Sequence, residues 1–247
     1  MRKNTRASGW RALASKYWAM TGEAPAASGV WLGIGAFMKR RTLTAGDESR
    51  TPLNAGRRTP SCGWMAYGGV QSGFVLFPAG PADADALAHV HVTAWRETYR
   101  GLLPDAYLAR MSEPGHARRF ARRLLQPGPD DVTLAMADRQ GIVGYAEGGP
   151  SRRRVSGEAE VATLYLLRAV QGRGLGRQLL GAAARSLAAH GATSLVISVL
   201  RDNIPARHFY ERLGGRAEPP RMEPGPGGAM LPEVAYHWPD IGTLARP

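Results

Sequence analysis

The feature that most constrains the fold is a glycine-rich turn, Gln171 to Gly176, between an apolar, strand-like segment and an amphipathic, helix-like segment. Glycines at positions 172, 174 and 176 allow the backbone to curl tightly and to direct successive N–H groups toward one point. The helix expected to follow adds the positive partial charge of its N-terminus, about half an elementary charge. Such a turn is typical of a pyrophosphate site, and Arg173 and Arg177 add charge at its rim.

Spacing separates the ligand classes that use such turns. A P-loop ends in Gly-Lys followed by Ser or Thr, whereas the last lysine of this chain is Lys39. A dinucleotide fingerprint requires glycine at the position of Arg177 and an N-terminal strand–helix–strand unit, whereas this turn lies late in the chain. A turn with a purely structural role remains open as an alternative.

Hydrophobic periodicity from Phe74 onward indicates alternating strands and helices. Strands are expected at 74–77, 132–137, 142–147, 159–167, 194–199 and 233–238, and the second and third form a hairpin. Helices are expected at 84–100, 104–111, 116–125, 175–190 and 204–213. The sequence therefore predicts an α/β domain over residues 74–240, followed by a tail, residues 241–247.

Basic charge is concentrated at the front of the chain. Residues 1–73 hold 11 of the 32 lysines and arginines but only 3 of the 20 acidic residues, a net charge of +8 out of +12. They show no sustained helical or strand period, so they are expected to form a basic, disordered extension. A membrane-surface or nucleic-acid-binding element at residues 29–41 is the alternative. The small excess charge of the remainder makes nucleic acid an unfavoured partner.

Cysteine content and hydropathy limit the cellular context. A single cysteine, Cys62, excludes an intramolecular disulfide framework. The longest apolar run, residues 29–38, is far shorter than the roughly 18 residues that a membrane span needs. We therefore expect a cytoplasmic protein without a membrane partner.

Three further segments give the glycine-rich turn a context. The strand segment Glu160 to Leu166 precedes the turn, and Asn203 and Tyr210 follow it seven residues apart. Together these segments resemble the GNAT N-acyltransferase superfamily, over about residues 74–238. The segment from His91 to Pro104 is similar to the first two helices of many small bacterial members.

This resemblance implies a mixed, splayed central sheet flanked by helices, with acetyl-CoA as co-substrate bound in the gap of the sheet. The backbone of Leu164, Tyr165 and Leu166 would pair with the pantetheine arm, and Asn203 would contact the cofactor. The pyrophosphate would lie on Gln171, Gly172, Arg173, Gly174, Leu175, Gly176 and Arg177. The chain departs from the family pattern at Arg168, where many members have proline, and at Gly215, where an aromatic residue is usual.

Acyl transfer to an amine needs the free base. A lysine-like amine has a pKa of about 10.4, so its deprotonation at pH 7 costs about 4.6 kcal/mol. Glu160 is the candidate general base, with a merely polar position at the strand end as the alternative. Tyr210 is the candidate donor to the departing thiolate, with packing beside Phe209 as the alternative.

The acceptor is expected to be a primary amine of a small molecule or peptide, and Trp95 and Tyr99 are expected to line its pocket. Ser198 stands where acetyltransferases of ribosomal-protein N-termini usually have glutamate. No metal is expected, because His89 and His91 would point to different faces of a helix. The leading hypothesis is an acetyl-CoA-dependent N-acetyltransferase. An inactive acyl-CoA-binding sensor is the alternative, and a homodimer remains open.

Overall fold

The computed structural model describes residues 73–245, so the expected extension over residues 1–73 lies almost wholly outside the described residues. The described part contains one eight-stranded sheet. Its strands are β1 (Val75–Pro78), β2 (Val132–Ala137), β3 (Ile142–Pro150), β4 (Glu158–Leu166), β5 (Ser194–Leu200), β6 (Arg216–Ala217), β7 (Arg221–Pro224) and β8 (Met230–Trp238). They lie in the order β1-β2-β3-β4-β5-β8-β6, and β7 also pairs with β8.

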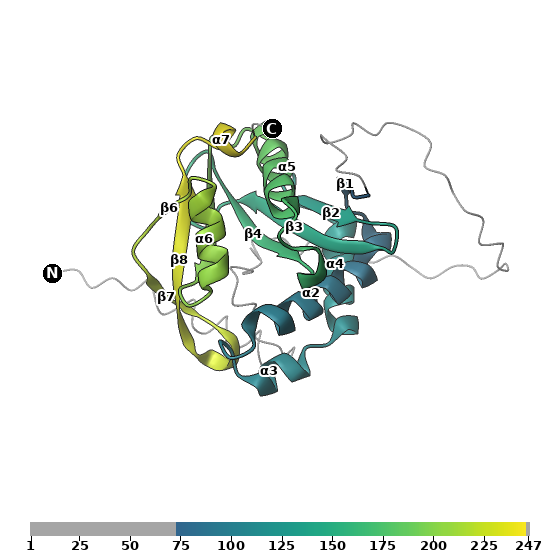
Figure 1. Cartoon of the computed structure of the whole chain (residues 1–247). Helices are drawn as coiled ribbons and strands as arrows, with labels where there is room; N and C mark the ends of the chain where they lie inside the picture. Colours follow the sequence, from purple (N-terminus) through teal and green to yellow (C-terminus); the bar gives the residue numbers. More distant parts are fainter. Residues whose placement is uncertain (1–72, 246–247) are drawn as a thin grey trace, which may run out of the picture.

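Helices cover both faces of this sheet (Figure 1). They are α2 (Ala84–Tyr99), α3 (Asp105–Arg110), α4 (Glu113–Leu125), α5 (Leu175–Ala189), α6 (Ile204–Arg212) and α7 (Gly242–Ala245). Short 3-10 turns stand at η1 (Pro81–Asp83), η2 (Arg168–Val170) and η3 (Pro226–Gly228). Between residues 73 and 245, none of the helices is both long and apolar enough to cross a bilayer.

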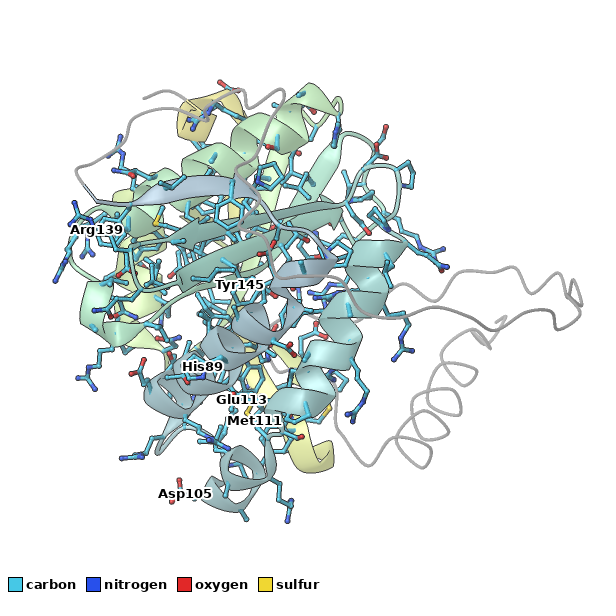
Figure 2. The ribbon with its side chains drawn as sticks, turned by 90° about the vertical axis from the view of Figure 1, so that its right-hand side faces the viewer. His89, Asp105, Met111, Glu113, Arg139 and Tyr145 are labelled. Atoms are coloured by element: carbon cyan, nitrogen blue, oxygen red, sulfur yellow. The ribbon has the colours of Figure 1, made fainter. Side chains whose placement is uncertain are left out.

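One core lies between the sheet and α5, α6 and α7, and we call this side the α5 face. The other core lies under α2 and α4, and we call that side the α2 face. Figure 2 views the α2 side, where Tyr145 of β3 lies under the helices. There the His89 side chain of α2 meets Glu113 at the start of α4, with 3.2 Å between Nδ1 and Oε1.

Most predicted elements are present, with shifted boundaries. α4 begins three residues earlier than expected, because Ser112 caps it by accepting a hydrogen bond from the Gly115 N–H (3.3 Å). β8 begins at Met230 instead of Glu233, because β7 pairs with its first half. β6, β7 and α7 are not predicted from the sequence. Leu244 of α7 is buried against α5, within the segment expected to be a tail.

The sheet opens between its two central strands. β4 and β5 are the parallel pair, and they are joined only at Glu158–Glu160 opposite Ser194–Val196. Beyond this point β4 continues to Leu166 and β5 to Leu200 without pairing with each other. The parting coincides with a bulge, because Thr163 pairs with Glu147 and Val161 with Gly148, which leaves Ala162 as an extra residue. The mixed, splayed sheet expected from the sequence is therefore confirmed.

Gly215, one of the two departures noted in the sequence, lies against Trp238 of β8. A Cβ on Gly215 would stand 2.6 Å from Cζ2 of Trp238 and 3.0 Å from the Tyr210 carbonyl oxygen. We expect Gly215→Ala to lower the free energy of unfolding by about 1–3 kcal/mol, because the buried indole cannot move away freely. Urea denaturation measures this.

Gly80→Ala is the matched control for Gly215→Ala. Gly80 has an ordinary φ of −118°, and its nearest neighbour would be 4.0 Å from the new Cβ. The free energy of unfolding of Gly80→Ala should equal that of the wild type or exceed it by about 0.5 kcal/mol. Equal stability of the two variants would contradict the overpacking argument.

Candidate active site

The glycine-rich turn has the backbone conformation that its sequence suggests. Gly172 and Gly174 adopt positive φ angles of 75° and 76°, which favour glycine, and Gly174 precedes the first residue of α5. Among the described residues no side chain caps this helix, and its first turn contains no acidic residue. The turn is exposed, so the N–H groups at the start of α5 are available to an anion.

The side chains around the turn fix it to the sheet and leave charge at its rim. Gln171 donates its side-chain amide to the Leu166 carbonyl (2.9 Å), which joins the turn to the end of β4. Leu175 is buried in the core, and Gly176 lies so close to α6 that a Cβ there would be 3.2 Å from the Phe209 ring. Arg173 and Arg177 are exposed.

The predicted strand residues Leu164, Tyr165 and Leu166 lie on the part of β4 that has left β5. This segment pairs with β3 on one side and with no strand of the described chain on the other. Peptide groups on that second side need a hydrogen-bonding partner. An extended ligand in the split can therefore pair with β4 as an added strand does.

Tyr210 of α6 lies on the α5 face and is 6% exposed. Its ring packs against Phe209, Tyr236 and Trp238, with centroids 5.3, 5.6 and 6.2 Å away. Burial raises the pKa of its hydroxyl well above the usual value, and the Tyr99 hydroxyl adds to the rise.

Asn203 has a definite structural role. Its side-chain oxygen accepts a hydrogen bond from the Ala206 N–H (3.3 Å) and so caps α6, the helix that carries Tyr210. It is buried at the end of the loop after β5.

On the α2 face, a cavity of about 250 Å³ lies where β4 and β5 part. Its wall is built from the strands on both sides of the split and from the loops beside them. The charged members of this wall are Arg152, Arg153, Glu160, Glu218, Arg221, Glu223 and Glu233.

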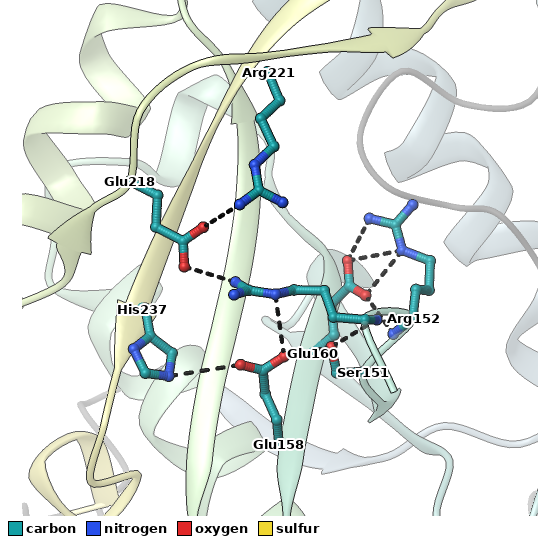
Figure 3. Close-up of polar contacts among 8 residues, drawn as sticks. Ser151, Arg152, Glu158, Glu160, Glu218, Arg221 and His237 are labelled. Atoms are coloured by element: carbon teal, nitrogen blue, oxygen red, sulfur yellow. Dashed lines mark hydrogen bonds and ion pairs between the residues drawn. The ribbon is translucent and has the colours of Figure 1, made fainter. Parts of the chain in front are cut away.

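Glu160 lies on this wall, 4% exposed, but its carboxylate is occupied by Arg152 (Figure 3). Oε1 accepts from Nε (3.0 Å) and Nη2 (2.6 Å), and Oε2 accepts from Nε (2.9 Å) and the backbone N–H (3.2 Å) of Arg152. A carboxylate has about four lone-pair positions, so Arg152 satisfies Glu160 almost completely.

The neighbouring carboxylates in Figure 3 are also paired. Glu158 accepts from the Ser151 hydroxyl (2.7 Å) and faces His237 at 3.6 Å. Glu218 accepts from Arg153 Nη1 (2.7 Å) and faces Arg221 at 3.6 Å.

Glu233, a further residue of this wall, is not predicted as a site residue from the sequence. It lies on β8 opposite Leu200 of β5 and is 7% exposed. Burial raises the pKa of its carboxyl to about 7; Arg152 partly offsets this, while Glu223 and Glu160 add to the rise. The only sequence signal for it was a lone acidic residue at the start of an expected strand.

Trp95 and Tyr99, predicted for the acceptor pocket, lie in the core of the α2 face and are not on the cavity wall. Trp95 is fully buried, and the Tyr99 hydroxyl is 3.0 Å from the Tyr165 hydroxyl. Within residues 73–245, no group of three or more His, Cys, Asp or Glu side chains could hold a metal ion.

Comparisons of the sequence with known proteins agree with this arrangement. Residues 92–215 match the sequence model of the Acetyltransferase (GNAT) family. The chain is also 32% identical over 164 residues to YuaI of Bacillus subtilis (strain 168), described as an uncharacterized N-acetyltransferase, a match that covers 66% of this chain and 91% of YuaI. The chain belongs to the GNAT acetyltransferase family. The resemblance seen in the sequence is thereby confirmed, and this GNAT protein is an acetyltransferase.

Solved structures show the same fold. The PaiA N-acetyltransferase of Thermoplasma acidophilum, in complex with coenzyme A, has a TM-score of 0.51 at 19% identity, covering 68% of this chain and 100% of its own. YncA of Salmonella typhimurium, a putative acetyltransferase with acetyl-CoA, has a TM-score of 0.53 at 19% identity, covering 69% and 95%. The fold of this GNAT protein is therefore the one expected from its sequence.

The raised pKa of Glu233 predicts how stability depends on pH. The folded state disfavours the charged carboxylate, so ionisation of Glu233 lowers stability progressively as the pH rises from the ordinary value of about 4.5 to about 7. Glu233→Gln cannot ionise, so its advantage over the wild type should grow across this range by up to about 3 kcal/mol and then level off. Urea denaturation at pH 4.5, 6 and 8 measures the difference.

Glu223→Gln serves as the control for that measurement. It removes a carboxylate from an exposed position on the same wall, so its difference from wild type should be much smaller across this range. An advantage of Glu233→Gln that is constant with pH would contradict the raised pKa.

Proposed function

We propose that this protein binds acetyl-CoA in the split between β4 and β5 and transfers its acetyl group directly to the primary amine of a small molecule or peptide. The observation that carries the proposal is the unpaired side of β4 beyond Glu160, which ends at the glycine-rich turn. An unpaired strand edge suits the amide-containing pantetheine arm, and the turn suits the pyrophosphate. The relatives solved with coenzyme A or acetyl-CoA support this assignment.

The residues proposed to hold acetyl-CoA are those of the split and the turn. Because Gln171 already donates to the Leu166 carbonyl, the pantetheine amides are expected to pair with the peptide groups of Leu164 and with the Leu166 N–H; those of Tyr165 face β3, on the side where the Leu167 N–H donates to the Val143 carbonyl. Gly172 to Arg177 would hold the pyrophosphate through backbone N–H groups and the two exposed arginines. Asn203 would act there chiefly by fixing the first turn of α6.

In the proposed reaction, the acceptor nitrogen attacks the thioester carbonyl carbon; a C–N bond forms and the C–S bond breaks. Tyr210 would approach from the α5 face and the acceptor from the cavity on the α2 face. An ordinary tyrosine is about 2 kcal/mol too weak an acid to protonate a thiolate fully, and burial of Tyr210 widens that gap. Tyr210 is therefore proposed to donate a hydrogen bond to the sulfur.

Glu160, Trp95 and Tyr99 are proposed to have roles other than those predicted from the sequence, and kinetics would test them. With Arg152 occupying Glu160, this carboxylate is expected to hold the arginine in the cavity wall. Trp95 and Tyr99 are expected to shape the acceptor side from within the core. A cytoplasmic location and a homodimer also stay predictions.

Turnover tests the function. Purified full-length protein is incubated with acetyl-CoA and a panel of alkylamines, diamines and short peptides; released thiol is measured with a chromogenic reagent, and acetylated products by mass spectrometry. Release of CoA with at least one amine supports the proposal. Binding of acetyl-CoA without turnover on any amine would favour a sensor.

Tyr210→Phe keeps the ring and its packing but deletes the hydroxyl. We expect kcat to fall about 100-fold, because the departing sulfur loses its hydrogen-bond donor, while stabilisation by acetyl-CoA persists. Steady-state kinetics and thermal shift measure the two effects. Tyr236→Phe, which deletes the hydroxyl of a ring packed against Tyr210, should change kcat less than threefold. A similar small change in Tyr210→Phe would make Tyr210 structural.

Gly172→Val should abolish the thermal stabilisation by acetyl-CoA, because the side chain obstructs approach of the pyrophosphate to the turn. Gly214→Val is its matched control, since Gly172 (φ 75°) and Gly214 (φ 82°) share the left-handed conformation and neither has a heavy atom within 4 Å of a new Cβ. Both variants should lose about 1–2 kcal/mol of stability. Only Gly214→Val should still respond to acetyl-CoA; an equal response of wild type to ATP or NAD would refute the donor assignment.

A further inference from the structure

We propose that Glu233, and not Glu160, accepts the proton from the acceptor's ammonium group; this rests on the acetyl transfer proposed above. No sequence pattern pointed to Glu233. The assignment comes from its place on the cavity wall and from the contacts of its neighbours.

Glu233 lies on the correct side of the sheet for an attacking amine. It pairs with Leu200 in β5, so its side chain shares a face with Val196 and Ser198, which line the cavity on the α2 face. Tyr210 belongs to the core of the opposite face. The proposed proton acceptor and the proposed hydrogen-bond donor to sulfur therefore approach the split from opposite sides.

Among the four carboxylates on the cavity wall, Glu233 alone is both buried and unpaired within the described residues. Arg152 occupies Glu160, and Glu218 is joined to Arg153 and Arg221. Glu223 has no hydrogen bond or ion pair among these residues, but it is exposed to water. An incoming ammonium would thus find its strongest partner in Glu233, the desolvated carboxylate that no arginine holds.

The charged groups around Glu233 affect the pKa of its carboxyl. Arg152 from the loop before β4 favours its ionised form, whereas Glu160 on β4 and Glu223 on β7 oppose it. Arg221, the residue paired with Glu233 across β7 and β8, adds positive charge on the same wall. Burial, the largest cause, acts together with Arg152, Glu223 and Glu160 to give this carboxyl a pKa of about 7, close to the pH at which a general base works best.

With Glu233 as the proton acceptor, every proton of the reaction is accounted for. The ammonium gives one proton to the Glu233 carboxylate, directly or through a water, and the neutral nitrogen then attacks the thioester carbonyl carbon. The C–N bond forms, the C–S bond breaks, and the second nitrogen proton ends on the CoA sulfur. The proton on Glu233 leaves to water through the cavity. The products are the acetylated amine, CoA thiol and one released proton.

The decisive measurement is the pH profile of kcat/KM for an amine that the wild type acetylates. In Glu233→Gln, kcat/KM should fall about 100-fold at pH 7, and the bend of the pH profile near pH 7 should disappear. The activity should partly recover at high pH, where the amine arrives neutral. Glu223→Gln removes an equal charge from the same wall. Its kcat/KM should stay within threefold of wild type, and its pH profile should bend at a lower pH. Glu160→Gln should keep a bend.

A second variant separates proton transfer from structural damage. Glu233→Ala leaves space for a small carboxylate, so added formate should restore part of its activity and should not stimulate Glu233→Gln. Stabilisation by acetyl-CoA should be unchanged in both variants.

Two results would overturn the proposal: an unchanged pH profile in Glu233→Gln, or loss of the bend in Glu160→Gln alone. If the wild type binds acetyl-CoA but acetylates no amine, the proposed function fails and the assignment fails with it. If the wild type acetylates an amine and Glu233→Gln has the same kcat/KM and pH profile, only the assignment of Glu233 as proton acceptor is refuted.

Discussion

The single extra residue in β4, Ala162, is the constraint on which the site depends. Glu160 is the last residue of β4 that pairs with β5, and the bulge follows immediately. A bulge bends its strand and increases the local twist, so β4 turns away from its parallel neighbour. Gly148 on β3 permits this, because a Cβ there would stand 2.9 Å from the Glu160 carbonyl oxygen and 3.1 Å from Leu187. Local backbone geometry thus opens the sheet and leaves one side of β4 unpaired.

An open sheet allows chemistry from both of its faces. In a continuous sheet, the core that holds Tyr210 and the wall that holds Glu233 would be separated by a complete layer of backbone. The split removes that layer beyond Glu160. The proposed division of labour, with a proton acceptor on one side and a hydrogen-bond donor on the other, follows from the topology.

The sequence predicts the parts of the site that lie within a few neighbouring residues. It does not predict the parts that depend on contacts between distant segments. The turn at Gly172 and the capped helix of Asn203 are each encoded within a few neighbouring residues, so their pattern is visible before folding. Glu233 depends on pairing between β7 and β8, in a segment whose prolines and glycines conceal β7 and the first three residues of β8. The pairing of Glu160 depends on a turn that brings Arg152 back across it. Spacing alone ranks Glu160 above Glu233; the hydrogen bonds that Arg152 makes to Glu160 reverse that order.

Arg152 connects these two carboxylates and explains why they differ. The carboxylates of Glu160 and Glu223 raise the pKa of Glu233, whereas Arg152 lowers it. Arg152 gives its hydrogen bonds to Glu160 but only its field to Glu233, so one carboxylate becomes a fixed part of the wall while the other keeps its lone pairs free. If Arg152 bonded to Glu233 instead, that group would become a weaker base and would no longer be open to an amine. The choice of partner by one arginine therefore determines which glutamate can do chemistry.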